Sequence, residues 1–287
     1  MSEKHIDKIS GVETTGHEWD GIRELNNPMP RWWVWTFYLT ILWAIGYTIA
    51  YPAWPLINGA TQGLLGWNSR GDIAADIADA KQLQSVFVDK IANASLAEIQ
   101  TDPALSQFAL SGGAAAFKVN CIQCHGSGAE GGQGYPNLND DDWMWGGSVE
   151  DIYTTVKHGI RFADDADTRA SEMPAFVDIL KSDEIREVAA YVVSLTGTPS
   201  NPALVEPGKQ VFADNCASCH GEDAKGNREF GAPNLADAIW LKARGEEGIA
   251  AQIRSPKHGV MPAWGERLGD TTVKQLAIFV HSLGGGE

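Results

Sequence analysis

The pentapeptide Cys-x-x-Cys-His occurs twice, at residues 121–125 and 216–220, and constrains this chain more than any other feature. Two cysteines three positions apart on a turn can bond the two vinyl groups of one haem, and the adjacent histidine then lies under the iron. We therefore predict two covalently bound haem c groups per chain. The thioether bonds would come from Cys121, Cys124, Cys216 and Cys219, and the proximal iron ligands would be His125 and His220.

The residues around each pentapeptide also recur, which indicates an internal repeat. Gly113, Phe117 and Asn120 return 95 positions later as Gly208, Phe212 and Asn215. Further along, a Met-Pro-Ala-aromatic sequence occurs at 173–176 and again at 261–264. A proline-rich stretch at 198–203 separates the copies and is implausible as helix. The sequence thus predicts two related domains, residues 105–200 and 201–287.

Three other uses of paired cysteines compete with haem attachment. Four cysteines could form one structural zinc site, but a histidine directly after each second cysteine is not needed for that. Thioredoxin-like chemistry would call for a βαβ pattern, which is not visible around either motif. A disulfide within each pair is the third alternative.

Methionine is the expected second axial ligand, because a thioether opposite histidine raises the reduction potential of a haem. Met173 and Met261 stand in the repeated loops, and the proline after each keeps it out of helical geometry. His158 and His258, both followed by glycine, are rival ligands, and Met144 is more typical of packing. Two adjacent domains could also exchange loops, with Met173 on the second haem and Met261 on the first; the sequence leaves both pairings open.

Other residues have supporting roles by position. A ligating histidine usually donates its second ring N–H to a carbonyl, and the backbone oxygens of Pro136 and Pro233 are the candidates. Gly113 and Gly208 would let the first helix of each domain cross closely against a closing helix, the one that carries Tyr191 or Phe279.

Residues 32–51 contain no charge and are long enough, as a helix, to cross a bilayer. Tryptophans gather at one end and tyrosines at the other, as at membrane interfaces, and Pro52 stops the helix. A core helix or a signal peptide is the alternative. We predict a cytoplasmic segment 1–31 and a transmembrane helix 32–54. Arg23 and Arg31 precede the span, and c-type haem is attached outside the cytoplasm, which places the haem domains in the periplasm.

A helical linker is expected over residues 55–104, packed on a partner or on the next domain, or else solvated. The formal net charge is -15, and this excludes a nucleic-acid partner. Residues 105–200 carry 6 basic and 14 acidic side chains, and residues 201–287 carry 9 and 11. A basic electron donor would be steered to the more acidic first domain. The alternative is that its acids form only a solvated loop surface.

The segment 20–33, Asp-Gly-Ile-Arg-Glu-Leu-Asn-Asn-Pro-Met-Pro-Arg-Trp-Trp, runs into the span, which ends in Tyr51-Pro-Ala-Trp-Pro55. Joined to two haem motifs, it resembles the dihaem subunit of cbb3-type cytochrome c oxidases. The resemblance implies an all-α chain: one amino-terminal transmembrane helix and two domains similar to class I cytochromes c. It also implies an inner-membrane subunit that passes electrons from a soluble cytochrome c to a monohaem subunit and on to a haem-copper catalytic subunit. Oxygen reduction would belong to that other chain.

Two functions of other classes stay open on the sequence alone. One is a free-standing, membrane-anchored dihaem shuttle that needs no tight partner. The other is a haem enzyme of peroxidase type, which requires an open position on one iron.

Overall fold

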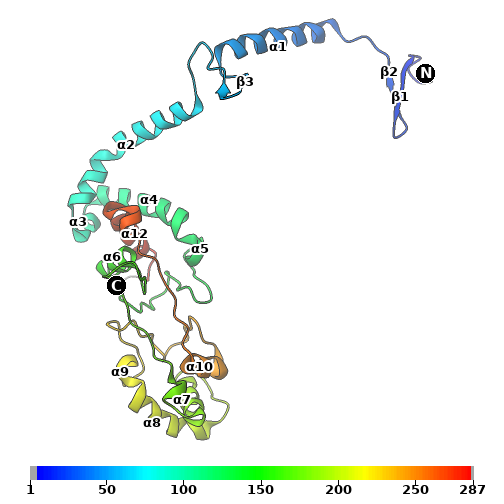
Figure 1. The fold of residues 1–287 in the computed structure, drawn as a ribbon. Helices are drawn as coiled ribbons and strands as arrows, with labels where there is room; N and C mark the ends of the chain where they lie inside the picture. Colours follow the sequence, from blue (N-terminus) through cyan, green and yellow to red (C-terminus); the bar gives the residue numbers. More distant parts are fainter. Residues whose placement is uncertain (1–4, 286–287) are drawn as a thin grey trace. The chain divides into compact units, whose positions relative to one another are not determined.

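The structure is a computed structural model that describes residues 5–285. The chain forms two compact units, Met1–Leu83 and Gln84–Glu287, and the order of their helices and strands is drawn in Figure 1. The first four residues of the predicted segment 1–31 and the last two of the second repeat lie outside the described part.

Helix α1 (Arg31–Ala50) is the predicted membrane span. Of the helices in the described residues, α1 is the one whose length and apolar composition would let it cross a bilayer. None of its residues is buried. It begins after Pro30 and ends where Tyr51 becomes extended, because Pro52 disfavours helical geometry in the residue before it. The helix is therefore shorter than the predicted span 32–54.

Two short antiparallel hairpins flank α1. Strands β1 (Thr14–Trp19) and β2 (Ile22–Leu25) pair through a turn at Asp20 and Gly21, both with positive φ. An Asp-Gly pair is favoured in such two-residue turns. Strands β3 (Pro55–Leu56) and β4 (Gly59–Ala60) form the second hairpin. The chain is thus mostly helical, as expected for the all-α class, and the two short hairpins are elements that the sequence analysis did not predict.

The linker contains helices α2 (Ser69–Asn93) and α3 (Leu96–Thr101). Ser95 and Glu98 form a reciprocal capping box that begins α3. The boundary between the two units lies within α2, whose last turns bring Phe87 and Ile91 to a hydrophobic core. The range 55–104, predicted as a helical linker, thus contains these two helices and the short strands β3 and β4.

The rest of the second unit is built from helices and short 3₁₀ turns. In chain order these are α4 (Pro103–Asn120), α5 (Ile122–His125), α6 (Val149–His158), η1 (Phe176–Asp178), α7 (Ser182–Ser194), η2 (Pro202–Leu204), α8 (Val205–Asn215), α9 (Ala217–His220), α10 (Gly245–Arg254), α11 (Gly265–Leu268) and α12 (Asp270–His281).

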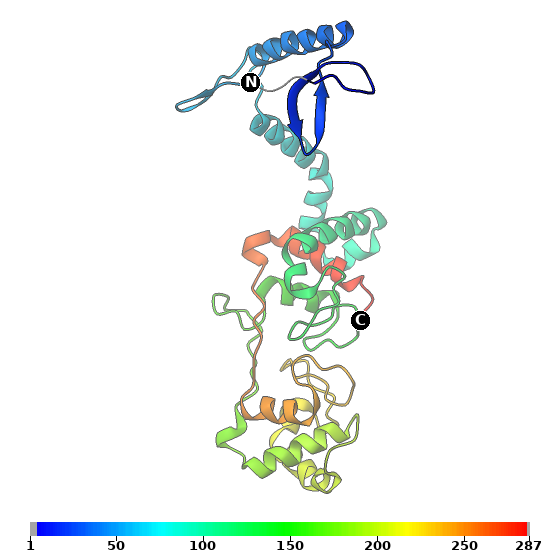
Figure 2. The same ribbon diagram turned by 90° about the vertical axis from the view of Figure 1, so that its right-hand side faces the viewer.

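These helices enclose two hydrophobic cores, and each core takes helices from both sequence repeats. In the first core, α12 packs against α4 and α6. In the second core, α7 packs against α8 and α10. Figure 2 shows two segments running side by side between the cores: one leads out of α6 and the other returns to α11 and α12. The carboxyl-terminal helices of the two repeats are therefore exchanged.

The two repeated glycines lie at the helix crossings of the two cores. A Cβ on Gly113 would collide with the Gln275 carbonyl oxygen and the Phe279 Cβ. A Cβ on Gly208 would collide with the Glu187 carbonyl. Ring pairs follow the same exchange: Phe117 lies 5.5 Å from Phe279, and Phe212 lies 5.2 Å from Tyr191. Close glycine crossings are present, but each joins helices of different repeats, whereas the prediction of two separate domains placed each crossing within one repeat.

Candidate functional site

Each Cys-x-x-Cys-His motif is a helix end followed by one short turn of helix. Helix α4 ends at Asn120 and is capped by Cys121, whose carbonyl accepts from the Cys124 and His125 amides at 3.1 and 2.9 Å. In the second core, α8 ends at Asn215 and is capped by Cys216, which accepts the same bonds from Cys219 and His220. The glycine after each histidine has a φ of about +80°, so the chain turns away at once.

All four cysteines of the motifs are free thiols. Burial, and then the neighbouring thiol of the pair, raises the pKa of Cys121 and of Cys216 to about 11, so both are protonated at neutral pH. Within the described residues, the one group of three or more potential metal ligands close together contains no cysteine. Cys121 packs on the first core and Cys216 lies in the second, an arrangement that does not favour one zinc site shared by all four cysteines.

The two histidines have the same environment. His125 Nδ1 lies 3.1 Å from the Pro136 carbonyl oxygen, and His220 Nδ1 lies 3.2 Å from that of Pro233. These are the two carbonyls that the sequence analysis named. Burial lowers the pKa of each imidazole, although the carbonyl opposes this, so the neutral form is favoured. With Nδ1 occupied as a donor, Nε2 is the nitrogen left to bind a metal.

A partly open apolar cavity of about 90 Å³ adjoins the first motif. Cys121 and His125 line it, together with Met261 from the second repeat. Its remaining wall includes Met144, from the Trp143–Trp145 loop that the sequence analysis assigned to packing. The apolar lining brings the Cys121 thiol, the His125 imidazole and the Met261 thioether to one site, a set of side chains suited to an apolar group that carries a metal.

Met173 packs against the second core, among the residues around Cys216 and Phe212. Met261 packs against the first core, which contains Phe117 and touches Cys121. Each methionine of the repeated loops therefore accompanies the motif of the other repeat. Of the two pairings that the sequence left open, this packing favours the crossed one.

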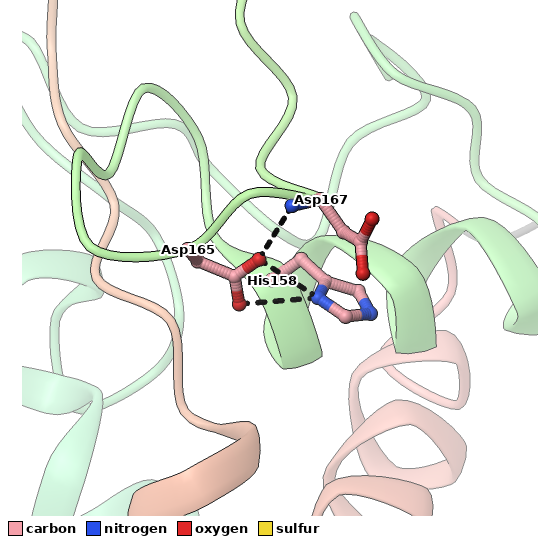
Figure 3. Close-up of side chains that lie close together, drawn as sticks. All are labelled: His158, Asp165 and Asp167. Atoms are coloured by element: carbon pink, nitrogen blue, oxygen red, sulfur yellow. Dashed lines mark hydrogen bonds and ion pairs between the residues drawn. The ribbon is translucent and has the colours of Figure 1, made fainter.

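His158, one of the rival iron ligands, takes part in a different group. Its Nδ1 lies 3.1 Å from both carboxylate oxygens of Asp165, and Asp167 stands beside them (Figure 3). The ligand atoms of these three residues lie within 4.8 Å of one another. The group closes the acidic loop 160–171 onto the end of α6. In the part of the chain that is described, His158 is not among the residues that line the cavity.

Comparison with known proteins places the chain in a family. Residues 11–58 match the N-terminal domain of cytochrome oxidase-cbb3, FixP, and residues 108–192 and 203–280 match the family described as cytochrome c oxidase, cbb3-type, subunit III. The chain is 66% identical to subunit FixP of Rhizobium meliloti (strain 1021), over 99% of this chain and 98% of the relative. It is 52% identical to subunit CcoP of Cereibacter sphaeroides, over 96% and 95%. The chain belongs to subunit III of the cbb3-type cytochrome c oxidases.

Subunit III is the dihaem electron-transfer subunit of this oxidase, and it is not the catalytic one. Two cytochrome c domains, each with its own cysteine pair, imply two haem c groups in this chain. The residues present fit them: free thiols, neutral imidazoles and, in the first core, an apolar cavity. Family membership favours the oxidase subunit over the free shuttle and the peroxidase-type enzyme.

Several residues of subunit III near these sites were not singled out from the sequence. Asp142 and Trp145 line the cavity, Arg169 lies over the Trp145 ring at 5.3 Å, and Arg161 binds two distant loops. Both arginines lie in the acidic loop 160–171. Trp143 and Trp145, which line the cavity, were the sequence signal that could have identified this side of the site.

Proposed function

We propose that the two haems of this subunit have crossed axial ligands: His125 with Met261 on the first haem, and His220 with Met173 on the second. The thioether bonds come from Cys121 with Cys124 and from Cys216 with Cys219. The proposal is supported by the packing of Met261 into the core of the first motif and of Met173 into the core of the second. The carbonyls of Pro136 and Pro233 hold the imidazoles in the ligating tautomer.

Met144 is the competing thioether in the first cavity. Met261 is favoured because backbone bonds fix its position: its amide donates to the Ile160 carbonyl at 3.0 Å and its carbonyl accepts from the Ile160 amide at 2.9 Å. Pro262 then keeps the loop extended. A ligand whose backbone is held by two hydrogen bonds is displaced less easily than one on a loop without them.

Ligand pairing can be tested by removing one haem at a time. In a chain with Cys121→Ala and Cys124→Ala, only the second haem is attached. There, Met173→Leu should abolish the red charge-transfer band of methionine-ligated ferric haem, whereas Met261→Leu should leave it. The reverse is expected with Cys216→Ala and Cys219→Ala, where Met144→Leu is the matched control. Loss of the band with the methionine of the same repeat would overturn the crossed assignment.

For the oxidase, we further propose that this subunit accepts electrons from a soluble cytochrome c and passes them to a monohaem subunit and then to the haem-copper oxygen site. Bound haem supplies the one-electron redox change, and histidine with methionine keeps its potential high. The chain's own residues exclude water from the first haem, through the apolar cavity wall. The single observation that carries this function is the pair of haem motifs within a full-length match to subunit FixP.

Acidic residues of the first repeat are proposed to steer a basic donor. Asp141, Asp164 and Asp167 are exposed and available for this, whereas Asp142 and Asp165 are half-buried. The rate of reduction by a basic cytochrome should therefore fall as ionic strength rises. A rate that stays flat would reject steering. Co-purification with a haem-copper subunit after mild detergent extraction tests the assembly itself, and a solitary chain would contradict it.

The amino-terminal segment is proposed to be cytoplasmic, with the haem unit in the periplasm of a bacterial inner membrane. Support comes from Arg23 and Arg31 before the span and from the chemistry of c-type haem attachment. A cysteine introduced at Ser2 should react with a membrane-impermeant maleimide only after spheroplasts are lysed. Labelling of intact spheroplasts at this position would reverse the orientation.

A further inference from the structure

The two methionine loops meet where the chain passes between the cores. Ile160 forms the two-way backbone pair with Met261, and the next residue, Arg161, donates its amide to the Arg169 carbonyl at 2.8 Å. Arg161 has a φ of +52°, in the left-handed region that residues other than glycine seldom adopt. A residue other than glycine keeps this conformation only when its surroundings hold it there, and the contacts of the Arg161 side chain are part of those surroundings.

The Arg161 guanidinium binds one carbonyl in each methionine loop. Its Nε donates to the Gly259 carbonyl at 2.7 Å, and its Nη1 donates to the Ser171 carbonyl at 2.8 Å. Gly259 stands two residues before Met261, and Ser171 stands two residues before Met173. The two acceptors are therefore equivalent positions of the repeat, and one planar group holds both.

This contact is maintained although the surroundings disfavour a cation. Arg161 is half-buried, and burial lowers the pKa of its guanidinium, an effect that the charge of Glu172 opposes. Lys242 lies close enough for the Arg161 charge to lower its pKa further, after burial. A guanidinium offers several donors in a fixed plane, which suits two carbonyl oxygens from separate strands better than an ammonium does.

We propose that Arg161 is a positioning residue shared by both haem sites: it fixes the two methionine loops against each other, so that the stability of both iron–sulfur bonds depends on one side chain. This inference rests on the proposed methionine ligation. Because the bonds reach both loops at the same position, losing the guanidinium should loosen Met173 and Met261 together. A residue that serves one core would loosen one methionine only.

The test uses the full chain, purified in detergent with both haems attached. Imidazole binds a ferric haem of this kind only after the methionine sulfur has left the iron, so its affinity reports how firmly each loop is held. Arg161→Gln should bind imidazole roughly tenfold more tightly at each haem, the equivalent of one lost charge-assisted hydrogen bond per loop. In the reduced protein, the two axial methionine methyl resonances distinguish the haems, and both should shift or broaden.

Two further variants separate geometry from charge. Arg161→Lys keeps the charge but replaces the planar fork, and it should resemble Arg161→Gln. Arg186→Gln removes one positive charge from an exposed ion pair on α7, and it should resemble the unaltered protein. Arg161→Lys also serves if Arg161→Gln does not mature.

The inference is overturned if the Arg161 variants change only one haem, or neither, while the unaltered protein shows two methionine-ligated haems. If the unaltered protein lacks methionine ligation, the proposed function itself has failed, and the two failures are thereby distinguished.

Discussion

The two haem cores contain the same parts, but the chain completes them in different ways. The second core is continuous: its methionine, at 173, comes first, then α7, then the haem motif at 216–220 and α10. The first core is interrupted: it uses residues 87–156 and then 261–283, with the whole second core between. The second core is thus a reordered cytochrome inserted into the first.

This difference shows that the order of helices along the chain does not determine the core. What each core requires is a motif helix, a close glycine crossing and a methionine loop, and these can be supplied from either direction. The first core depends on the last residues of the chain, whereas the second does not.

The largest effect is expected from ending the chain after His258. The first core would lose α12, where Val273, Leu276, Ile278 and Val280 are buried and together contribute about 6 to 12 kcal/mol. That is comparable with the entire stability of a domain. We expect the first haem to lose methionine ligation and the second to keep it, as measured by haem content and the red charge-transfer band. If each repeat folded by itself, the truncation would damage the second haem instead.

Replacing the crossing glycines should destabilise one core at a time. Gly113→Ala places a methyl group against the Gln275 carbonyl and should destabilise the first core by about 2 to 3 kcal/mol, the upper part of the usual range for overpacking. Limited proteolysis should then cleave α12, not α7. Gly208→Ala should release α7. Gly132→Ala, with nothing within 4 Å of the added Cβ, is the control and should leave the denaturation midpoint unchanged.

The sequence predicted much of this molecule because its motifs are local. Cys-x-x-Cys-His determines the haem positions within five residues, and the Nδ1 contacts to Pro136 and Pro233 join positions fewer than fourteen residues apart. The membrane span was indicated by the twenty uncharged residues 32–51. The hairpin at Asp20 and Gly21 also had a recognisable local signal, an Asp-Gly turn between residues with strand preference.

The exchange of closing helices could not be predicted in the same way. Gly113 and Gly208 are equivalent, and both closing helices offer an aromatic ring and an approachable backbone, so either partner is sterically acceptable. The choice is decided by long-range contacts such as Ile160 with Met261, which no periodicity reveals. For the same reason Arg161 looked like one more charge in an acidic loop.

A smaller loss of stability is expected where the end of α2 contacts α12. Lys274 Nζ binds the carbonyls of Ile91, Ala92 and Ala94 at 2.9 to 3.3 Å, which caps the end of α2 and ties it to α12. Lys274→Met should destabilise the first core by about 1.5 to 3 kcal/mol, the range for hydrogen bonds to a charged group. Lys209→Met, an exposed lysine of the second core, is the control in guanidinium unfolding followed at each haem. An equal loss in both variants would show that charge alone is responsible.

Asp142 gives the smallest effect and the one that depends on pH. Its carboxyl lines the first cavity, and burial, followed by repulsion from Asp237, Asp140 and Asp141, raises its pKa from 3.8 to about 6. A raised carboxyl pKa means that the folded state binds the proton more tightly than the unfolded state. Below about pH 4 the Asp142 carboxyl therefore does not lower the free energy of unfolding. As pH rises to about 6 it lowers that free energy progressively, and above this pH the effect stays constant.

Asp142→Asn removes this cost, so the variant should be more stable than the native chain above pH 6 and equal to it near pH 4. The expected gain is about 1 kcal/mol, because solvent reaches the carboxyl and screens part of the repulsion. Unfolding midpoints across this pH window measure it, with Asp141→Asn as the exposed neighbour that should gain only a few tenths of a kcal/mol. A gain in stability that persists at pH 4 would mean that Asp142 destabilises the first core through packing rather than through its charge.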